Sequence, residues 1–453
     1  MTGKVINFPG TGAIASPLGL FLRLGGGGVR ALGDLIAAGH LLPERVVVDA
    51  ANLSAQRDLI QDLRLRGVEI VLDPKVAEMG ARAVSAEKLR KLPWAFQADD
   101  STLGPDHFGR GANTDVIDAI ARFCVINRVD AVLSPSHWLG DPNCRDWLQR
   151  DAHSCQVLRS ALDREGGKGI AIDFAVIAPH TLIREPSDRD ELIAVIKDSP
   201  AENLWIRASG MKSNSSPLSH SRHIEAMAAY QELNRPLIAD CLGGMAGLGL
   251  MAFGAVSGIA HGIGRHTGFD ARTWHNEPRR RVGDEDGPRS QKRILLSDIN
   301  RSLSAKEVEC LASARGGRKL ISCSDRECCP SGVDDMLRDP RRHAARQTMS
   351  QYRELERVPD LKRPHHLIHD ILEGASRKAR RIAKLKPEVK DESFSSMKIE
   401  SLIRRLEDNA DTLDKTRTAL EKLHAKLGDG AFAPKHLRSR QAQKGLFDLK
   451  GRN

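Results

Sequence analysis

Short apolar segments alternate with amphipathic stretches over the first 265 residues of the chain. The apolar segments have the length of buried strands, and the stretches between them carry apolar residues at helical spacing, as in 55–66, 114–125 and 223–233. The strand candidates are Leu20–Leu24, Arg45–Asp49, Glu69–Asp73, Asp130–Ser134, Gly169–Phe174, Leu204–Ala208, Pro236–Asp240 and Ser257–Gly262. Because strands separated by helices pair in parallel through right-handed crossovers, this pattern predicts an α/β fold, a (β/α)8 TIM-type barrel. A doubly wound open sheet is the alternative, since the count of eight includes a weak first strand.

The pattern changes after Gly268. Residues 270–300 are polar and rich in Arg, Asp and Gly, which indicates a long loop or insertion, and charged helical sequence follows from about residue 334. We therefore expect a barrel in 1–268, a linker and Cys/His segment with a closing helix in 269–375, and a basic helical extension in 376–453. The last stretch, from Gly428 on, is basic and poor in apolar residues, so we expect it to be flexible.

A heptad pattern lies within the extension. Its seam consists of Ile399, Leu406, Leu413, Leu420 and Leu427, supported by Leu402 and Leu423 and interrupted by Asn409 and Thr416. The seam predicts a coiled coil or a helical hairpin, through which the chain would form a homo-oligomer or bind a partner protein. An amphipathic helix lying on the barrel explains the same pattern equally well.

Composition limits the class of protein. A hydrophobic content of 40% and a charged content of 28% are typical of globular proteins. No apolar run approaches the roughly 20 residues that span a bilayer, so we expect no membrane partner. The N-terminus shows no signal-peptide pattern, and the eight cysteines lack a regular disulfide spacing, so we expect a cytoplasmic protein.

Charge points toward a polyanion. The formal net charge is +10, residues 377–386 carry six positive charges and no acid, and Arg279–Arg281 adds three more. Clustered Lys and Arg residues favour nucleic acid, either DNA or tRNA, as a partner, although a solvated basic surface has the same composition.

Polar residues gather at the predicted strand ends, where TIM barrels carry their active sites. Asp49, Asp73, Asp173 and Asp240 each end a strand or lie near its end. A carboxylate there can accept a proton or attack an electrophilic carbon, whereas an Asp that caps the next helix has only a structural role. We select Asp49, Asp173 and Asp240 as catalytic candidates. The other polar residues at strand ends are Ser134, Ser136, His137, Arg207, Ser209, His261 and His266.

Glycines after two strands allow the backbone to approach a ligand closely. Gly25–Gly28 follow the first strand, and Gly243 and Gly244 follow the seventh. No GxGxxG or GxxxxGK[ST] pattern is present, so these glycines predict a pocket for a phosphate or a flat ring, with a tightly packed helix as the alternative.

The cysteines give a more specific signal. Cys310, Cys323, Cys328 and Cys329 lie within 20 residues beyond the predicted barrel, and His343, His365, His366 and His369 follow them. Zinc takes four Cys or His ligands in tetrahedral geometry, so the segment predicts a structural Zn²⁺ site. The spacing leaves open whether Cys310 replaces Cys328 or Cys329, and chance clustering or a reactive thiol pair remains the alternative.

This arrangement resembles the tRNA-guanine transglycosylase family, in which a cysteine knuckle follows the barrel's last strand and a His opens a helix. The segments CSDRECC at 323–329 and HHLIHDIL at 365–372 occupy those places in the same order. The resemblance implies Cys323, Cys328, Cys329 and His365 as zinc ligands. The family's general base, an Asp after an early strand, matches Asp49 in VVVDAANL, although the family's Gly-Gly-Phe-Gln is absent. No Asp occupies the nucleophile position on the eighth strand, where GIAHGIG is found, and Asp240 is its nearest substitute.

The resemblance implies base exchange in nucleic acid. A carboxylate would attack a flipped-out guanosine and a 7-deazapurine would replace the guanine, with Arg207 and Ser209 hydrogen-bonding the base. A divergent relative that acts on DNA fits the missing motifs and the basic extension better than one that acts on tRNA. The alternatives are a barrel enzyme that binds a small phosphorylated substrate at Gly243, Gly244 and His261, and a non-catalytic nucleic-acid-binding or assembly protein.

Overall fold

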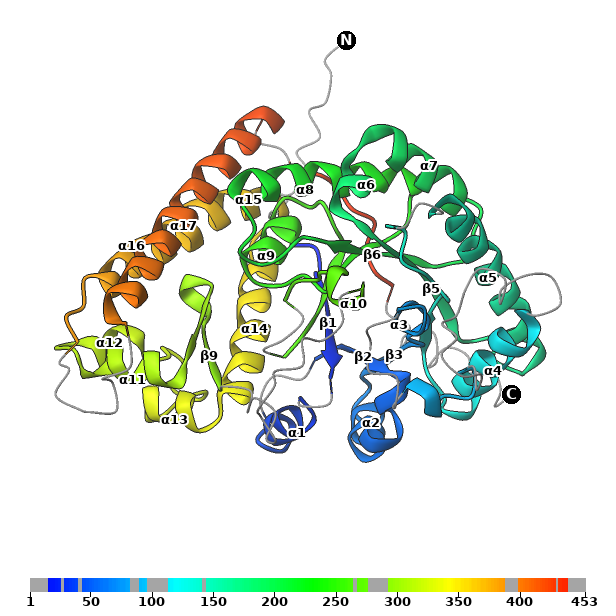
Figure 1. Ribbon diagram of the computed structural model, residues 1–453, viewed down its shortest axis with the longest axis horizontal. Coiled ribbons are helices and arrows are strands. Elements are labelled where there is room, and N and C mark those ends of the chain that lie inside the picture. Colours follow the sequence, from blue (N-terminus) through cyan, green and yellow to red (C-terminus); the bar gives the residue numbers. More distant parts are fainter. Residues whose placement is uncertain are drawn as a thin grey trace, which may run out of the picture.

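Eight parallel strands close into a barrel in the computed structural model of the protein (Figure 1). The structure describes residues 15–25, 28–39, 43–81, 89–95, 113–140, 144–263, 267–275, 292–387, 398–428 and 431–438. The strands are β1 (Gly19–Leu24), β2 (Arg45–Asp49), β3 (Glu69–Asp73), β4 (Ala131–Leu133), β5 (Ala171–Pro179), β6 (Asn203–Ser209), β7 (Leu237–Asp240) and β8 (Gly258–Gly262). Each strand pairs with the next along the chain, and β1 pairs with β8 to close the barrel. The predicted (β/α)8 class is confirmed.

Helices surround the strands, as the alternating pattern requires. Those of the barrel are α1 (Val29–Ala37), α2 (Arg57–Leu65), α3 (Val76–Met79), α4 (Asn113–Ile126), α5 (Cys144–Arg164), α6 (His180–Arg184), α7 (Pro186–Ile196), α8 (Pro217–Ala229), α9 (Gly244–Ala252) and α10 (Arg272–His275). Beyond them lie β9 (Arg293–Leu296), β10 (Arg301–Ser304), α11 (Ala305–Ser313), α12 (Gly317–Ile321), α13 (Val333–Arg338), α14 (Pro340–Glu356), α15 (Arg363–His365), α16 (Glu373–Ala383) and α17 (Ile399–Leu427). A π-helix, His366–Leu372, joins α15 to α16.

Alternation along the strands places a charged layer above an apolar one. The inward-facing apolar cluster includes Phe21, Val47, Val71, Trp205 and Ile238. Because successive side chains of a strand point to opposite faces, the residues two positions further along these strands also face the barrel interior, nearer its C-terminal mouth. Those residues are Arg23, Asp49, Asp73, Arg207 and Asp240.

One strand is longer than its sequence indicates, and this moves a catalytic candidate. The expected segment ended at Phe174, but β5 runs on to Pro179. Asp173 therefore pairs in register with Asn203, at the start of β6, and lies deep inside the barrel instead of at its mouth. The side chains of Asn203 and Trp205 donate hydrogen bonds of 2.9 Å to the fully buried Asp173 carboxylate. The expected strand-end position of Asp173 was wrong.

The extension packs on the barrel. The β9–β10 hairpin leads into α11–α14, and α14 packs against α1 and α9. Helix α17 packs along α16 and against α8, and buries Leu402, Leu406, Leu413, Leu420 and Leu423 (Figure 1). The heptad seam therefore belongs to an amphipathic helix paired with α16 on the barrel's outside. The polar interruption at Asn409 is satisfied, because its side-chain amide donates to the Ile299 carbonyl.

Part of the segment expected to be flexible is instead held against the barrel. In residues 431–438, the Phe432 amide donates to the Phe253 carbonyl, and Ser257 donates to the Lys435 carbonyl. Leu437 packs against the inward-facing apolar cluster. Because Ser257 directly precedes β8, this segment, the C-terminal strap, covers the N-terminal end of the barrel.

None of the helices in the described ranges combines the length and the apolar character that crossing a membrane demands.

Candidate active site and metal-binding cluster

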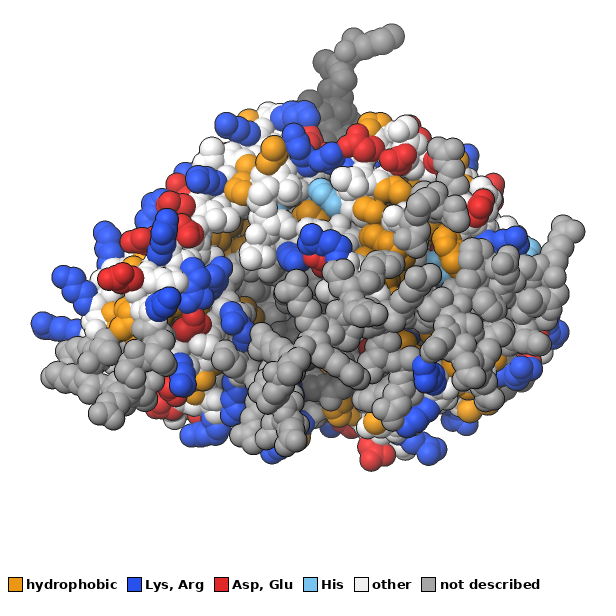
Figure 2. All heavy atoms as spheres, in the orientation of Figure 1, with side chains coloured by type: hydrophobic (Ala, Val, Ile, Leu, Met, Phe, Trp, Pro, Cys, Tyr) orange, Lys and Arg blue, Asp and Glu red, His pale blue; other side chains and the backbone are white. Residues whose placement is uncertain are grey.

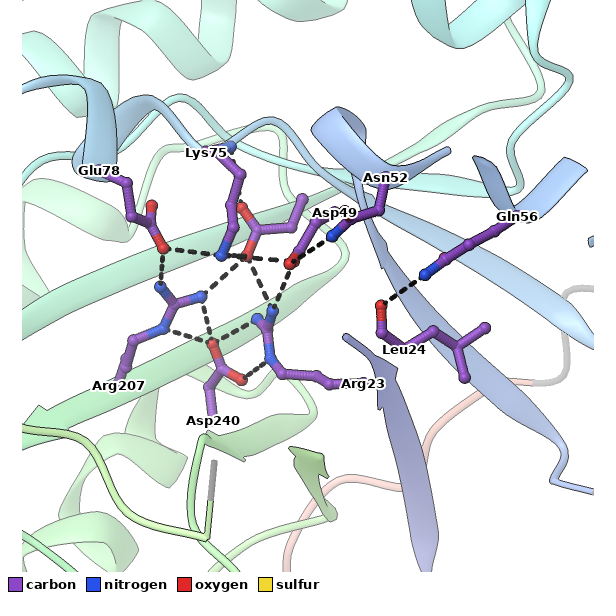
Figure 3. Close-up of polar contacts among 10 residues, drawn as sticks. Arg23, Leu24, Asp49, Asn52, Gln56, Lys75, Glu78, Arg207 and Asp240 are labelled. Atoms are coloured by element: carbon purple, nitrogen blue, oxygen red, sulfur yellow. Dashed lines mark hydrogen bonds and ion pairs between the residues drawn. The ribbon is translucent and has the colours of Figure 1, made fainter. Parts of the chain in front are cut away.

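Two arginines and two aspartates form a closed ion-pair network at the barrel mouth (Figure 3). Arg23 on β1 binds Asp240 on β7 through two hydrogen bonds of 2.6 and 2.7 Å, and donates to Asp73 on β3 at 2.8 Å. Arg207 on β6 also donates to both carboxylates, at 2.8 Å to Asp240 and 3.0 Å to Asp73. All four side chains are buried. Each charge therefore has partners of opposite sign, as burial requires.

A second group borders the network where the mouth is more open. Lys75 Nζ lies 2.7 Å from Glu78 Oε1 and 3.3 Å from Asp49 Oδ1 (Figure 3). The Asp49 side chain is 22% exposed, against 1% for Asp240 and 6% for Asp73. Its hydrogen bond from Asn52 is long, at 3.5 Å, and its distance to Arg23 is 3.8 Å. Asp49 is thus the most accessible and the least engaged of these aspartates.

The network keeps its carboxylates ionised. Burial alone would raise the pKa of Asp240, but Arg207 and Arg23 outweigh that effect and hold its pKa below the ordinary value. Burial opposes ionisation of Asp73 in the same way, and Lys75, Arg23 and Arg207 lower its pKa well below the usual range. The structure brings Asp49, Asp73 and Asp240 together from three strand ends. Asp49 and Asp240 were catalytic candidates in the sequence, whereas the third candidate, Asp173, lies elsewhere.

The backbone is strained at this site. Lys75 has φ +62° and Cys241, the residue after Asp240, has φ +55°, in the left-handed region that non-glycine residues rarely adopt. The Lys75 amide donates to Asp73 Oδ1 at 3.0 Å, and this bond fixes the carboxylate against the turn. Such strain is common where a functional site has to be held in place.

The remaining predicted residues lie around the mouth or behind it. Ser209 accepts a hydrogen bond from the Ala271 amide and so holds the segment after β8. The buried His261 side chain lies against Tyr352 of α14 and close to Gly243, so it is outside the ion-pair network. Gly243 and Gly244 open α9, with Gly244 at φ +60° beside Asn300. His266 and Arg279–Arg281 lie outside the described residues.

Sequence reasoning missed Arg23, Lys75 and Glu78. Arg23 interrupts the apolar segment LFLRL, two positions after the inward-facing Phe21. A charged residue at an inward position of a strand needs a buried partner, and that signal was available in the sequence. Lys75 and Glu78 occupy a turn and a four-residue helix, where nothing in the pattern fixes their orientation.

Three cysteines and one histidine form a compact cluster in the extension. The ligand atoms of Cys323, Cys328, Cys329 and His343 all lie within 4.8 Å of one another, and all four residues are buried. His343 Nδ1 lies 3.5 Å from Cys328 Sγ and 3.4 Å from Cys329 Sγ, and the two sulfurs are 3.6 Å apart. Around a tetrahedral zinc ion, neighbouring sulfurs would be ~3.8 Å apart and a sulfur and a nitrogen ~3.5 Å apart. The cluster could therefore hold a metal ion.

Surrounding hydrogen bonds orient these groups. His343 Nε2 lies 2.8 Å from the Leu295 carbonyl, which can only accept, so Nε2 carries a proton and Nδ1 is the nitrogen that faces the sulfurs and could bind a metal ion. The Asp325 carboxylate accepts from the Cys328 amide at 3.0 Å and from Arg346 at 2.6 Å, which fixes the turn that bears the cysteines.

The predicted histidine ligand was wrong. His365 is exposed, and its ring lies 4.3 Å from that of His369, away from the buried cysteines. His343 takes the fourth position because α14 carries it directly to the cysteine turn. Cys310 is buried in α11 and is not part of the cluster.

No protein-family model matches this chain, and no curated protein matches it in sequence. Among solved structures it is similar to a GH18 chitinase from Pseudoalteromonas aurantia, at 12% identity over 54% of this chain and 93% of the other, with a TM-score of 0.36. A GH26 β-mannanase from Bacteroides ovatus has 12% identity over 58% and 84% of the two chains, with a TM-score of 0.36. A chitinase from Chromobacterium violaceum has 14% identity over 49% and 68%, with a TM-score of 0.32. Similarities this low carry no statement about substrate or reaction.

Proposed function

We propose that the protein is a base-exchange transglycosylase that replaces guanine in nucleic acid, DNA in preference to tRNA, with a 7-deazaguanine derivative. The observation that carries the proposal is the convergence of Asp49, Asp73 and Asp240 at the mouth of the barrel, held by two guanidinium groups and one ammonium group. Ionised carboxylates at this end of a TIM barrel are suited to react at an anomeric carbon.

Asp49 is the reacting carboxylate in this proposal. The resemblance gave Asp49 the role of base and left Asp240 as the nearest substitute for the nucleophile. Both Asp240 oxygens, however, accept hydrogen bonds from the arginines, and the side chain is only 1% exposed. Asp49 is the carboxylate that a substrate can reach.

Asp49 and Glu78, which are partly exposed, then share the chemistry. Asp49 attacks C1′ of a flipped-out guanosine and the C1′–N9 bond breaks. The electron pair of that bond leaves with guanine, which takes up a proton. Glu78, which shares the Lys75 ammonium with Asp49, accepts the N9 proton of the incoming 7-deazapurine. That ring attacks C1′, the bond between C1′ and the Asp49 oxygen breaks, and the carboxylate is regenerated. The proton lost by the incoming ring balances the one gained by guanine.

A zinc ion in the Cys323–Cys328–Cys329–His343 cluster would be structural. Four protein ligands complete a tetrahedral site, leave no position for a substrate, and tie the turn before α13 to α14. Because α14 packs against α1 and α9, the ion would stabilise the docking of the extension on the barrel.

The basic face of α16 is the proposed contact for the phosphate backbone. Arg377, Arg380 and Arg381 are exposed along this helix, and Lys384, also exposed, caps its C-terminal end. Figure 2 shows Lys and Arg side chains along the side of the molecule that carries α16 and α17, with acidic side chains among them. Contacts of this kind would position nucleic acid without reading its sequence.

Incorporation of a labelled base tests the proposal. Purified protein is incubated with ¹⁴C-guanine or a labelled 7-deazaguanine and either duplex DNA or tRNA, and label in the polymer is counted. We expect label in DNA, at least 100-fold less with Asp49→Asn, and no loss with Asp58→Asn, which changes an exposed acid on α2. Nucleoside mass spectrometry of cells with and without the protein provides the second measurement. No incorporation in either polymer, with no deazapurine in cells, would overturn the proposal and favour a non-catalytic nucleic-acid-binding role.

A further inference from the structure

Three aromatic side chains gather beside the ion-pair network. The chain has only 18 aromatic residues among 453, with 11 Phe, 5 Trp and 2 Tyr, so three of them in one cluster is a notable concentration. The Trp138 ring centroid lies 6.4 Å from that of Phe269, and Phe269 lies 5.0 Å from Trp274, both in edge-to-face geometry. Trp274 is buried, whereas Trp138 and Phe269 are half-buried. We call these three residues the aromatic corner.

The backbone holds the corner rigidly. Trp138 forms a parallel bridge with Ile177 of β5, and Phe269 forms one with Ser209 of β6. A Cβ added at Gly140 would overlap the Trp138 indole, so the ring packs directly against this glycine. Both rings are therefore fixed to strands whose ends form the mouth.

The corner adjoins the charged groups of the candidate active site. The Arg207 guanidinium carbon lies 5.8 Å from the Phe269 ring centroid, within the range of a cation–π contact. Ala77 of α3, next to Glu78 in sequence, packs in the same cluster as Ile177 and Ala271.

We propose that the aromatic corner is a binding subsite for the planar heteroaromatic ring of a purine or 7-deazapurine, which stacks on Trp138 or Phe269. The bound ring would present its edge to Glu78. Aromatic side chains bind bases through their faces whatever the sequence, and the neighbouring Glu78 carboxylate can accept hydrogen bonds from the N–H groups of a purine edge. The identity of the ring rests on the proposed function; the subsite itself rests on the contacts of Trp138, Phe269 and Arg207.

Binding without turnover tests the subsite. The affinity of the purified protein for 7-deazaguanine and for guanine is measured by equilibrium dialysis, with N-acetylglucosamine as the sugar probe. Trp138→Ala and Phe269→Ala should each weaken binding of the bases on the order of 10-fold, whereas Trp138→Phe, which keeps a stacking face, should lose only about 2- to 3-fold. Thermal melting of each variant separates lost binding from lost folding.

A substitution of the glycine that packs against Trp138 tests the same ring without removing it. Gly140→Ala leaves both aromatic side chains in the chain but displaces the Trp138 indole, so it should weaken binding as Trp138→Ala does. Equal affinity of the wild type, Trp138→Ala and Phe269→Ala for the bases would overturn the proposal, as would binding of the sugar and not the bases. Base binding that depends on Trp138, in a protein that incorporates no label into DNA or tRNA, would retain the subsite and refute the transglycosylase reaction.

Discussion

His343 and Cys329, 14 residues apart in the sequence, place Nδ1 and Sγ 3.4 Å from each other in a buried cluster. An imidazole whose other nitrogen lies against a carbonyl, together with three cysteine sulfurs, is the donor set that zinc prefers in closed sites.

Two histidine substitutions distinguish the ligand sets. His343→Ala should lower bound zinc from about one ion per chain to well below it and should destabilise the extension, whereas His365→Ala should retain the ion. The measurement is metal content by plasma mass spectrometry after gel filtration. Full zinc content in His343→Ala with loss in His365→Ala would restore the ligand set implied by the family resemblance.

The guanidinium–carboxylate network should make Asp240→Asn costly. The substitution leaves Arg23 and Arg207 facing each other with Asp73 as their main remaining anionic partner, and breaking a buried ion pair costs about 3–5 kcal/mol. Urea unfolding measures the loss. Asp62→Asn, which removes the exposed Asp62–Arg66 pair, is the control and should cost no more than about 1 kcal/mol. Equal stability of the two variants would show that the network is not closed in solution.

Three histidines packed between α6 and α8, His220 and His223 buried and His180 half-buried, predict acid sensitivity. Burial lowers the pKa of His180 and of His220 to about 4, and burial together with these two neighbours lowers the pKa of His223 well below its ordinary value. The unfolded chain therefore binds more protons between pH 6.5 and 4. The stability contributed by the neutral imidazoles is complete above pH 6.5 and is lost as the pH falls, by at most about 1.4 kcal/mol per pH unit for each group.

Unfolding at pH 7.5, 6.0 and 5.0 measures this slope. His220→Gln should flatten the dependence, while His153→Gln, at an exposed position on α5, should leave it unchanged. The acids of the mouth do not obscure the result, because their lowered pKa values affect stability only below about pH 4. An unchanged slope in His220→Gln would contradict the assignment.

Charge reversal on α16 tests the nucleic-acid surface. Arg381→Glu combined with Lys384→Glu should weaken DNA binding and reduce the slope of log K against log salt by about 1 for each lost phosphate contact. Fluorescence anisotropy at several salt concentrations measures both quantities. Lys168→Glu, an exposed change in the loop before β5, is the control. A loss as large in the control would indicate that net charge alone governs binding.

The barrel could be predicted from sequence because its strands are short apolar segments with a regular helical spacing between them. The exact end of β5 could not, since AVIAP after Phe174 is compatible with either a strand or a turn. That ambiguity misplaced Asp173. The three cysteines do lie together in the structure, as the sequence predicts, but the fourth residue of the cluster depends on how α14 packs on the β9 hairpin, and no local pattern encodes that packing.

The family resemblance also could not assign roles to the charged residues at the barrel mouth. It selected Asp49 and Asp240 from strand ends, but their different accessibility results from Arg23 and Arg207, which lie on strands far apart in the chain. Which side chains meet across a barrel depends on the register of its strands, and that register is known only from the structure of the closed barrel.

The C-terminal strap has a consequence for synthesis of the protein. Ser257 and Lys435, which it joins, are 178 positions apart. At about 5–20 residues per second, a ribosome needs roughly 10–40 s to pass from one to the other. During that interval the barrel strands have been synthesised, but the inward-facing apolar cluster still lacks the Leu437 side chain that packs against it. The nascent chain therefore has an exposed apolar end that a chaperone or a neighbouring nascent chain could bind before the protein closes it.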